Sequence, residues 1–127
     1  MVSDPPDDHN VNPVFGKDFP VRRVLDLISK KWLPIVIYCL SSGKRRFGEL
    51  HTQIPGISTK VLAEVLKQLE TDGLARRKVF PEVPPRTEYE LTSLGRKLHE
   101  PIKLLCEWAL NNPQTLKRIE RNRSRRE

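Results

Sequence analysis

The sequence contains few of the residues from which catalytic and metal-binding sites are built. Its 127 residues include only three histidines and two cysteines. No partner at metal-ligand spacing accompanies His9, His51 or His99, and no glycine-rich loop of the phosphate-binding type is present. Cys39 and Cys106 lie far apart in apolar helical patterns, which favours reduced thiols over a disulfide framework. We therefore expect neither an enzyme nor a bound cofactor or metal ion.

Long apolar runs are also missing. No stretch approaches the length of a membrane-spanning helix, and the first residues are acidic and proline-rich, unlike a signal peptide. Apolar residues make up 37% of the chain and charged residues 31%, a balance typical of a soluble protein with one folded domain. These features predict a cytoplasmic protein without a membrane segment.

Acidic residues are outnumbered, since 23 lysines and arginines against 16 aspartates and glutamates give a formal net charge of +7. This excess of positive charge favours an anionic partner, either nucleic acid or an acidic membrane surface. The alternative is that the charge serves only to keep the protein soluble. Residues 1–18 are acidic and predict a disordered leader. We expect residues 19–111 to form the folded domain and residues 112–127 a basic C-terminal tail, either frayed helix or coil.

One stretch, from Ser58 to Gly73, has both ends of a helix marked. Ser58 stands where an N-cap side chain accepts a backbone N–H, and Gly73 where a chain leaves a helix in a left-handed conformation. The apolar residues recur at the spacing of one buried face, namely Leu62, Val65, Leu66 and Leu69. The opposite face is polar and free for a partner.

The residues before this stretch complete a helix-turn-helix. A short helix is expected from Pro20, and a second, from Lys30 to about Leu40, is apolar on nearly all sides and is predicted to be the central core helix. Residues 44–47 form a basic connector, for which a short strand is also open, and residues 47–54 indicate a short helix. The Pro55-Gly56 turn then separates this short helix from the capped one, as in a helix-turn-helix.

A β-hairpin is expected directly after the capped helix. Residues 74–80 form its first strand, and residues 86–91 alternate in polarity as its second strand. Three prolines between the strands make a stiff tip that cannot pair as a ladder. A helix-turn-helix followed by such a hairpin is a winged helix, so the predicted fold class is mainly α with a small β-hairpin wing.

The last long helix is expected from Thr92, its N-cap, to about residue 111, with a kink at Pro101. Its apolar surface, which includes Ile102 and Trp108, is wider than the core of one chain requires. Two interpretations are open: the N-terminal helix covers this surface within one chain, or a second subunit covers it.

Together these motifs resemble the HxlR-type regulators, a branch of winged-helix transcription factors that is similar to the MarR group. The resemblance spans about residues 19 to 110 and rests on the order and spacing of short motifs. They are Pro20-Val21, Leu25 to Ile28, Lys31-Trp32, Arg45 to Phe47, Glu49-Leu50, Pro55 to Ser58, Leu62, Leu66, Leu69-Glu70, Asp72 to Leu74, Pro81 to Arg86, Glu88-Tyr89, Leu91-Thr92 and Gly95.

The resemblance implies a homodimer joined through its terminal helices, with two recognition helices presented to double-stranded DNA. Many family members carry a cysteine directly before the first helix, and some sense oxidants with it. This chain has Phe19 there, so that role is not carried over, and Cys39 and Cys106 are interpreted as core residues. An unidentified small-molecule effector would bind between the DNA-binding core and the dimer helices, near Trp32 and Trp108.

The second helix of a helix-turn-helix enters the major groove with its N-terminal residues nearest the bases. The contacts predicted on this helix are Ser58, Thr59, Lys60, Glu64 and Lys67. Ser58 is explained equally well as a cap, a contact or both.

Three arginines complete the predicted site. Arg45 and Arg46 suit phosphate contacts, and Arg86, beside the proline-rich tip, is placed to enter the minor groove or clamp a phosphate. The alternative for Arg86 is a structural ion pair with Glu82 or Glu88. The chain is thus interpreted as a sequence-specific transcriptional regulator, the alternative being a winged-helix protein-interaction module that has no specific DNA binding.

Overall fold

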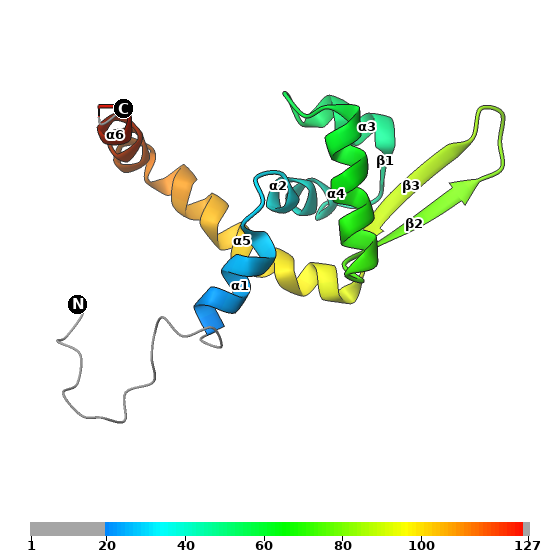
Figure 1. Cartoon of the computed structure of the whole chain (residues 1–127), viewed down its shortest axis with the longest axis horizontal. Coiled ribbons are helices and arrows are strands. Elements are labelled where there is room, and N and C mark those ends of the chain that lie inside the picture. Colours follow the sequence, from blue (N-terminus) through cyan, green and yellow to red (C-terminus); the bar gives the residue numbers. More distant parts are fainter. Residues whose placement is uncertain (1–19, 126–127) are drawn as a thin grey trace. The chain divides into compact units, whose positions relative to one another are not determined.

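The computed structural model describes residues 20–125 (Figure 1), so the leader expected at residues 1–18 lies outside the described residues. The elements, in chain order, are α1 (Pro20–Ile28), α2 (Leu33–Leu40), β1 (Arg45–Arg46), α3 (Phe47–Gln53), α4 (Thr59–Thr71), β2 (Ala75–Phe80), β3 (Arg86–Leu91), α5 (Ser93–Asn111) and α6 (Pro113–Ser124). They fall into two compact units, the first ending at Lys31 and the second beginning at Trp32. The predicted fold class, mainly α with a β wing, is confirmed.

The first unit contributes one helix, α1, which begins at Pro20 as predicted. No residue of α1 is buried. Four of its large apolar side chains, Val21, Val24, Leu25 and Leu27, are exposed, and Ile28 is half-buried. A nine-residue helix with an exposed apolar face has little to stabilise it in isolation, because most helical stability in proteins comes from packing.

The second unit is built around α2. Leu33, Val36, Ile37 and Leu40 of this helix are buried, and Pro34 lies in its first turn, where a missing N–H costs little. The predicted central core helix is therefore confirmed on the side that carries these four buried residues. The helix is not buried all round, since Ile35 and Tyr38 are exposed. An apolar composition alone did not reveal which side faces solvent.

The helix-turn-helix consists of α3 and α4. Leu50 of α3 and Leu62, Leu66 and Leu69 of α4 are fully buried, so the apolar face predicted for α4 forms much of the core. In the turn, Gly56 has a φ of +89°, a conformation that side chains disfavour. The Trp32 ring lies where a Cβ on Gly56 would touch it, so this aromatic side chain covers the turn.

The wing is a three-stranded antiparallel sheet with the order β1-β3-β2. Tyr89 at its centre is opposite Arg45 on one side and Arg77 on the other, while Glu88 is opposite Arg46 and Lys78. Because neighbouring residues of a strand point to opposite faces, these two rows define two faces of the sheet. The inner face carries buried Tyr89, and burial raises the pKa of its hydroxyl, which Arg77 partly opposes.

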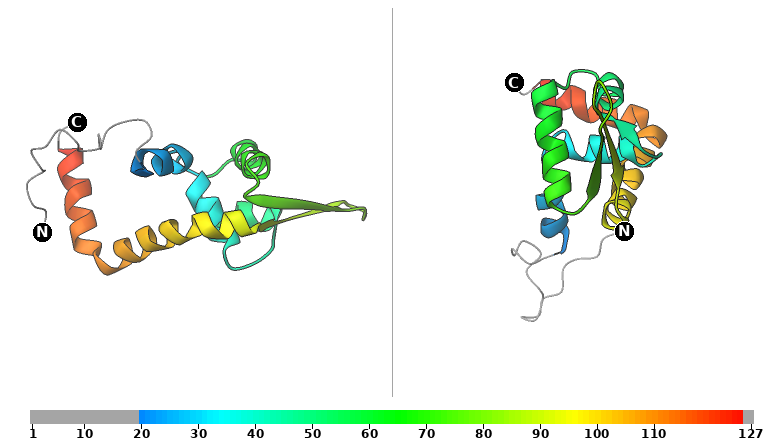
Figure 2. Two further views of the ribbon diagram at one scale, coloured as in Figure 1. Left: turned by 90° about the horizontal axis from the view of Figure 1, so that it is seen from below. Right: turned by 90° about the vertical axis from the view of Figure 1, so that its right-hand side faces the viewer.

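Helix α5 follows the wing and turns sharply into α6 (Figure 2). Thr92 caps α5 as predicted, accepting a hydrogen bond from the Gly95 N–H at 3.1 Å. Pro101 lies inside α5, and Ile102 next to it is buried. In the C-terminal region, for which helix and coil were both open, Pro113–Ser124 form helix α6.

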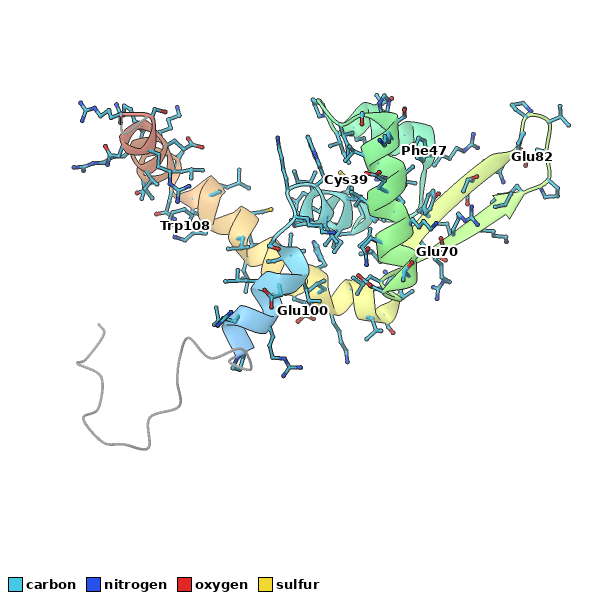
Figure 3. The ribbon with its side chains drawn as sticks, viewed as in Figure 1. Cys39, Phe47, Glu70, Glu82, Glu100 and Trp108 are labelled. Atoms are coloured by element: carbon cyan, nitrogen blue, oxygen red, sulfur yellow. The ribbon has the colours of Figure 1, made fainter. Side chains whose placement is uncertain are left out.

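The C-terminal half of α5 leaves large apolar side chains on the surface. Trp108 marks this region (Figure 3). The exposed side chains are Leu104, Leu105, Trp108 and Leu110. The wide apolar surface predicted for this helix is therefore present.

Candidate nucleic-acid interface

The face of α4 opposite the core is polar and fully accessible. Lys60, Ala63, Glu64 and Lys67 are exposed, as are Ser58 and Thr59 at the beginning of the helix. A 13-residue helix held by three fully buried leucines presents these side chains on a fixed support. All five residues predicted to contact DNA from this helix are thus exposed, and Lys60, Glu64 and Lys67 share the face opposite the core.

Ser58 makes the cap that its position predicted. Its Oγ accepts a hydrogen bond from the Val61 N–H at 3.1 Å, and its backbone is extended, as an N-cap requires. The hydroxyl hydrogen is not used by this bond. Ser58 can therefore cap α4 and donate to a ligand at the same time.

Arg45 and Arg46 do not act as a pair. Because they are consecutive in β1, Arg45 shares the inner face of the sheet with Tyr89, and Arg46 shares the outer face with Glu88. The Arg45 guanidinium donates to the Lys44 carbonyl and to the Ser42 hydroxyl, both at 2.8 Å. Arg46 is exposed and is the more available of the two cations.

Arg86 is held within the wing by two carboxylates. Its Nη1 lies 2.7 Å from the Glu82 carboxylate, and its Nε lies 3.3 Å from the Glu88 carboxylate. The guanidinium also stacks 3.8 Å from the centre of the Phe80 ring. The Nε is buried and not aligned to donate a hydrogen bond, so we regard the Glu88 contact as electrostatic and the Glu82 contact as the directional one. The ion pair weighed as an alternative is thus present with both glutamates.

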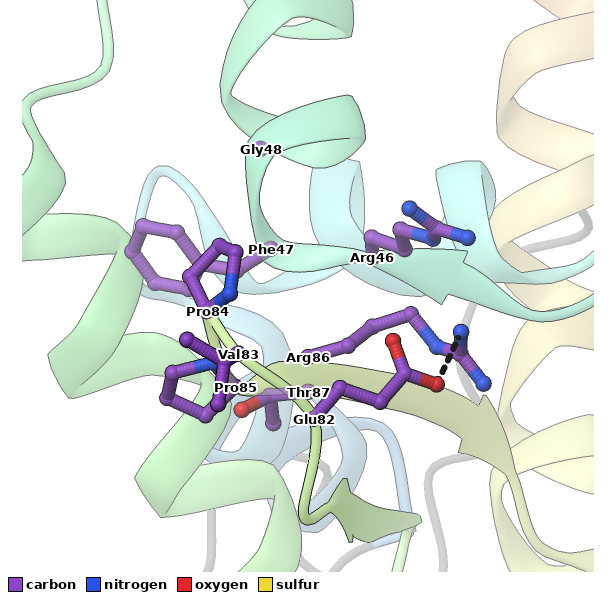
Figure 4. Close-up of a pocket in the computed structure, with 9 residues that line it drawn as sticks. All are labelled: Arg46, Phe47, Gly48, Glu82, Val83, Pro84, Pro85, Arg86 and Thr87. Atoms are coloured by element: carbon purple, nitrogen blue, oxygen red, sulfur yellow. Dashed lines mark ion pairs between the residues drawn. The ribbon is translucent and has the colours of Figure 1, made fainter.

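An open hollow of about 340 Å³ lies between this part of the wing and the beginning of α3 (Figure 4). Arg46, Phe47, Pro84, Pro85 and Arg86 contribute to its lining. In Figure 4 the guanidinium groups of Arg46 and Arg86 lie toward the same end of the hollow, with Phe47 and Pro84 toward the other. One end of the hollow therefore holds two arginines together with the Glu82 carboxylate that pairs with Arg86, and the other end is apolar.

Strand β2 carries three consecutive cations that the predicted site did not include. Arg76, Arg77 and Lys78 are all exposed. Arg76 lies 3.5 Å from Glu90, and Arg77 lies 3.8 Å from Glu70 of α4. The run of three basic residues in a strand is the sequence signal that could have identified them. Lysine and arginine on an edge strand have a second explanation, because they protect the strand from pairing with another chain.

Among residues 20–125, no group of histidine, cysteine and carboxylate side chains is placed to hold a metal ion. Over the same residues, no helix combines the length and the apolar character needed to cross a membrane.

The sequence and the fold of this chain are both similar to those of known helix-turn-helix proteins. The HxlR-like helix-turn-helix family matches residues 27–117, more than half of the chain. This protein is a member of the HxlR family. Its relatives include an HTH-type transcriptional regulator of Synechocystis, 43% identical over 78% of both chains. Another is YtfH of Escherichia coli, 38% identical over 81% of this chain and 82% of the relative.

Solved structures of similar proteins share the fold of this HxlR-family chain. A protein described as a MarR-family transcriptional regulator from Porphyromonas gingivalis has 38% sequence identity and a TM-score of 0.75, covering 80% of this chain and 99% of its own. The redox regulator HypR in its reduced form has 39% identity and a TM-score of 0.72, covering 77% and 97%. The predicted HxlR-type and MarR-like resemblance is confirmed.

Proposed function

We propose that this HxlR-family protein is a sequence-specific, DNA-binding transcriptional regulator that acts as a homodimer. The observation that carries the proposal is the exposed polar face of α4, whose capped first turn presents Ser58, Thr59 and Lys60. Recognition helices of this kind insert their first turn into the major groove, where hydroxyl and ammonium groups meet base edges and phosphates. Glu64 and Lys67 lie further along the same face.

The wing is the second contact in this proposal. Arg86 reaches the minor groove or a backbone phosphate, and Arg46 on the outer face of the sheet binds a phosphate. Arg45 is retained as a weaker contact, because its guanidinium is already bound to the loop before it. We add Arg76, Arg77 and Lys78 of β2, which are exposed; Arg76 and Lys78 share the outer face of the sheet with Arg46, and Arg77 lies on the inner face.

The homodimer is supported by unpartnered apolar surface on the terminal helices. Leu25 of α1 and Leu105 and Trp108 of α5 are among the exposed large side chains. Burying such groups against a second copy removes apolar area from water, which is the main driving force for stable association. Two subunits then present their α4 helices about one turn of DNA apart, ~34 Å, to a nearly palindromic operator.

The regulator acts in the cytoplasm by binding rather than by catalysis, and the folded domain over residues 19–111 carries the DNA-binding function. A small-molecule effector near Trp32 and Trp108 stays a prediction from the sequence. The competing function is a protein-interaction module with the same fold. Such a module would not require exposed lysines and arginines that are available to bind phosphates.

Selection from a random DNA library by the full-length protein tests the proposal. We expect enrichment of a nearly palindromic sequence, bound with an affinity that falls steeply as salt rises. Lys60→Ala should reduce the salt slope by roughly two for a dimer, one for each subunit. Lys97→Ala, which removes an exposed charge from α5, is the matched control and should leave the slope unchanged. Failure to enrich any sequence would favour the interaction module.

A further inference from the structure

The two glutamates that hold Arg86 occupy different environments. Glu88 lies on the central strand β3, and its side chain is 21% exposed. Glu82 lies outside the strands, in the connection between β2 and β3, and its side chain is 51% exposed. A carboxylate on the tip of a hairpin can move away without disturbing the sheet, whereas one on the central strand cannot. Glu82 is therefore the partner that Arg86 can exchange.

Arg86 has two further contacts that do not involve Glu82. The guanidinium rests on the Phe80 ring, directly opposite it in the β2–β3 register, and Glu88 lies beside the Nε. These contacts orient the group toward the end of the hollow where the guanidinium of Arg46 also lies (Figure 4). Releasing Glu82 would leave an oriented arginine with its Nη1 donor unoccupied.

We propose that Glu82 is an intramolecular competitor that occupies Arg86 in the free protein and gives way to a DNA phosphate in the complex. This inference rests on the proposed function, since it requires the wing to meet DNA. A phosphate oxygen and a carboxylate oxygen offer Arg86 the same kind of charge-assisted hydrogen bond, so the exchange replaces one acceptor with another. Arg46 at the same end of the hollow supplies a second positive charge for the incoming phosphate.

The exchange sets the strength of the wing contact. An arginine without a partner contributes the whole free energy of its interaction with the phosphate to binding. Arg86 contributes only the difference between its interaction free energy with the phosphate and that with Glu82. Glu82 thereby makes DNA binding weaker than the positive charge of the wing alone would give, which favours release of the operator. Glu82 is a residue that tunes affinity through Arg86 and does not itself touch DNA.

A double-mutant cycle on full-length protein tests the proposal. The probe is the duplex enriched from the random library, and the readout is its fluorescence anisotropy at fixed salt. We expect Glu82→Gln to tighten binding by about two- to fivefold for each subunit, the upper part of the range for loss of a competing, partly exposed ion pair. In an Arg86→Gln background, which keeps the stem on Phe80, the same change should alter affinity by less than about twofold.

Asp72→Asn is the control for net charge, because asparagine can keep the 2.9 Å hydrogen bond that Asp72 accepts from Gln68. It should change affinity less than Glu82→Gln does. An equal gain from Glu82→Gln in both arginine backgrounds, or an equal gain from Asp72→Asn, would mean that Glu82 acts by general repulsion, and would overturn the inference. If thermal melts show that Arg86→Gln unfolds the wing, the inference is tested by comparing the affinity changes of Glu82→Gln and Asp72→Asn alone.

The outcomes also separate this inference from the function on which it rests. If the unmutated protein enriches and binds a DNA sequence but Glu82→Gln leaves affinity unchanged or lowers it, the competitor role fails and the regulator stands. If no DNA binds under any salt condition, the proposed function itself fails.

Discussion

The hydroxyl of Thr92 donates a hydrogen bond to the carbonyl oxygen of Gly73, 2.6 Å away across the base of the wing. The same hydroxyl accepts from the Gly95 N–H, and the Thr92 N–H donates to the Leu74 carbonyl at 3.0 Å. One residue thus joins the end of α4, the start of the wing and the first turn of α5. This connection fixes α4 relative to the helix proposed to carry the dimer contacts.

Thr92→Ala should lower the free energy of unfolding by about 1–2 kcal/mol, because it removes an N-cap and a partly buried hydrogen bond together. Thr92→Ser keeps the hydroxyl and should recover most of this stability. Urea denaturation followed by circular dichroism measures both. Equal losses for the two variants would show that the methyl group, and not the hydroxyl, is the stabilising part.

Gly95→Ala should destabilise the protein by about 1–3 kcal/mol, the range for overpacking a tight contact. A Cβ on Gly95 would collide with the Leu74 carbonyl oxygen and press on the Leu91 side chain. Gly48 of α3 is the matched control, since a Cβ there meets no other atom within 4 Å. Gly48→Ala should stabilise slightly, because alanine is the better helix former. Thermal unfolding of the two variants should therefore shift in opposite directions.

Substitution of Ser58 separates its two proposed roles. Ser58→Ala removes the cap and should cost about 0.5–2 kcal/mol of stability together with DNA affinity. Ser58→Asn keeps the capping ability, since asparagine caps as well as serine, and should restore stability without restoring affinity. Urea titrations and anisotropy on the enriched duplex measure the two effects. Recovery of affinity by asparagine would show that the side chain is only a cap.

Charge placed on the apolar surface of α5 should break the proposed dimer. We expect the unmutated protein to sediment at twice its chain mass of 14.7 kDa. Leu105→Lys should weaken association by at least about tenfold, as at the centre of an interface. Val83→Lys, at the fully exposed wing tip, is the control and should leave the mass unchanged. A monomeric unmutated protein would remove the dimer from the proposed function.

The Cys39 thiol should react slowly at neutral pH. Burial raises its pKa above the ordinary value of 9.0, and Arg45 only partly opposes this shift. Because the thiolate is the reactive form, iodoacetamide should modify Cys39 of a Cys106→Ser variant with a pH midpoint above 9.0. Unfolding in urea should bring the midpoint back toward the ordinary value. A midpoint below 9.0 in the folded protein would indicate an activated cysteine and reopen a sensing role.

Periodicity and end signals in the sequence were sufficient to predict most of the fold. Ser58, Gly73 and Thr92 begin or end helices where local backbone chemistry predicted, because capping depends on neighbours within a few residues. The β-hairpin followed from alternation and prolines in the same way. The sequence could not show that Ile35 and Tyr38 of α2 are exposed, because the apolar composition of that helix marks no single buried side.

The sequence alone therefore determined the winged helix, the polar face of α4 and the basic balance that favours an anionic partner. The tertiary structure decided which cations are available. It separated Arg45 from Arg46 onto opposite faces of one sheet, and it brought Glu88 and Phe80 against Arg86 across a hairpin. Charge is a property of each residue and is visible in the chain, whereas the partner that neutralises it depends on strand register, which forms only when the wing folds.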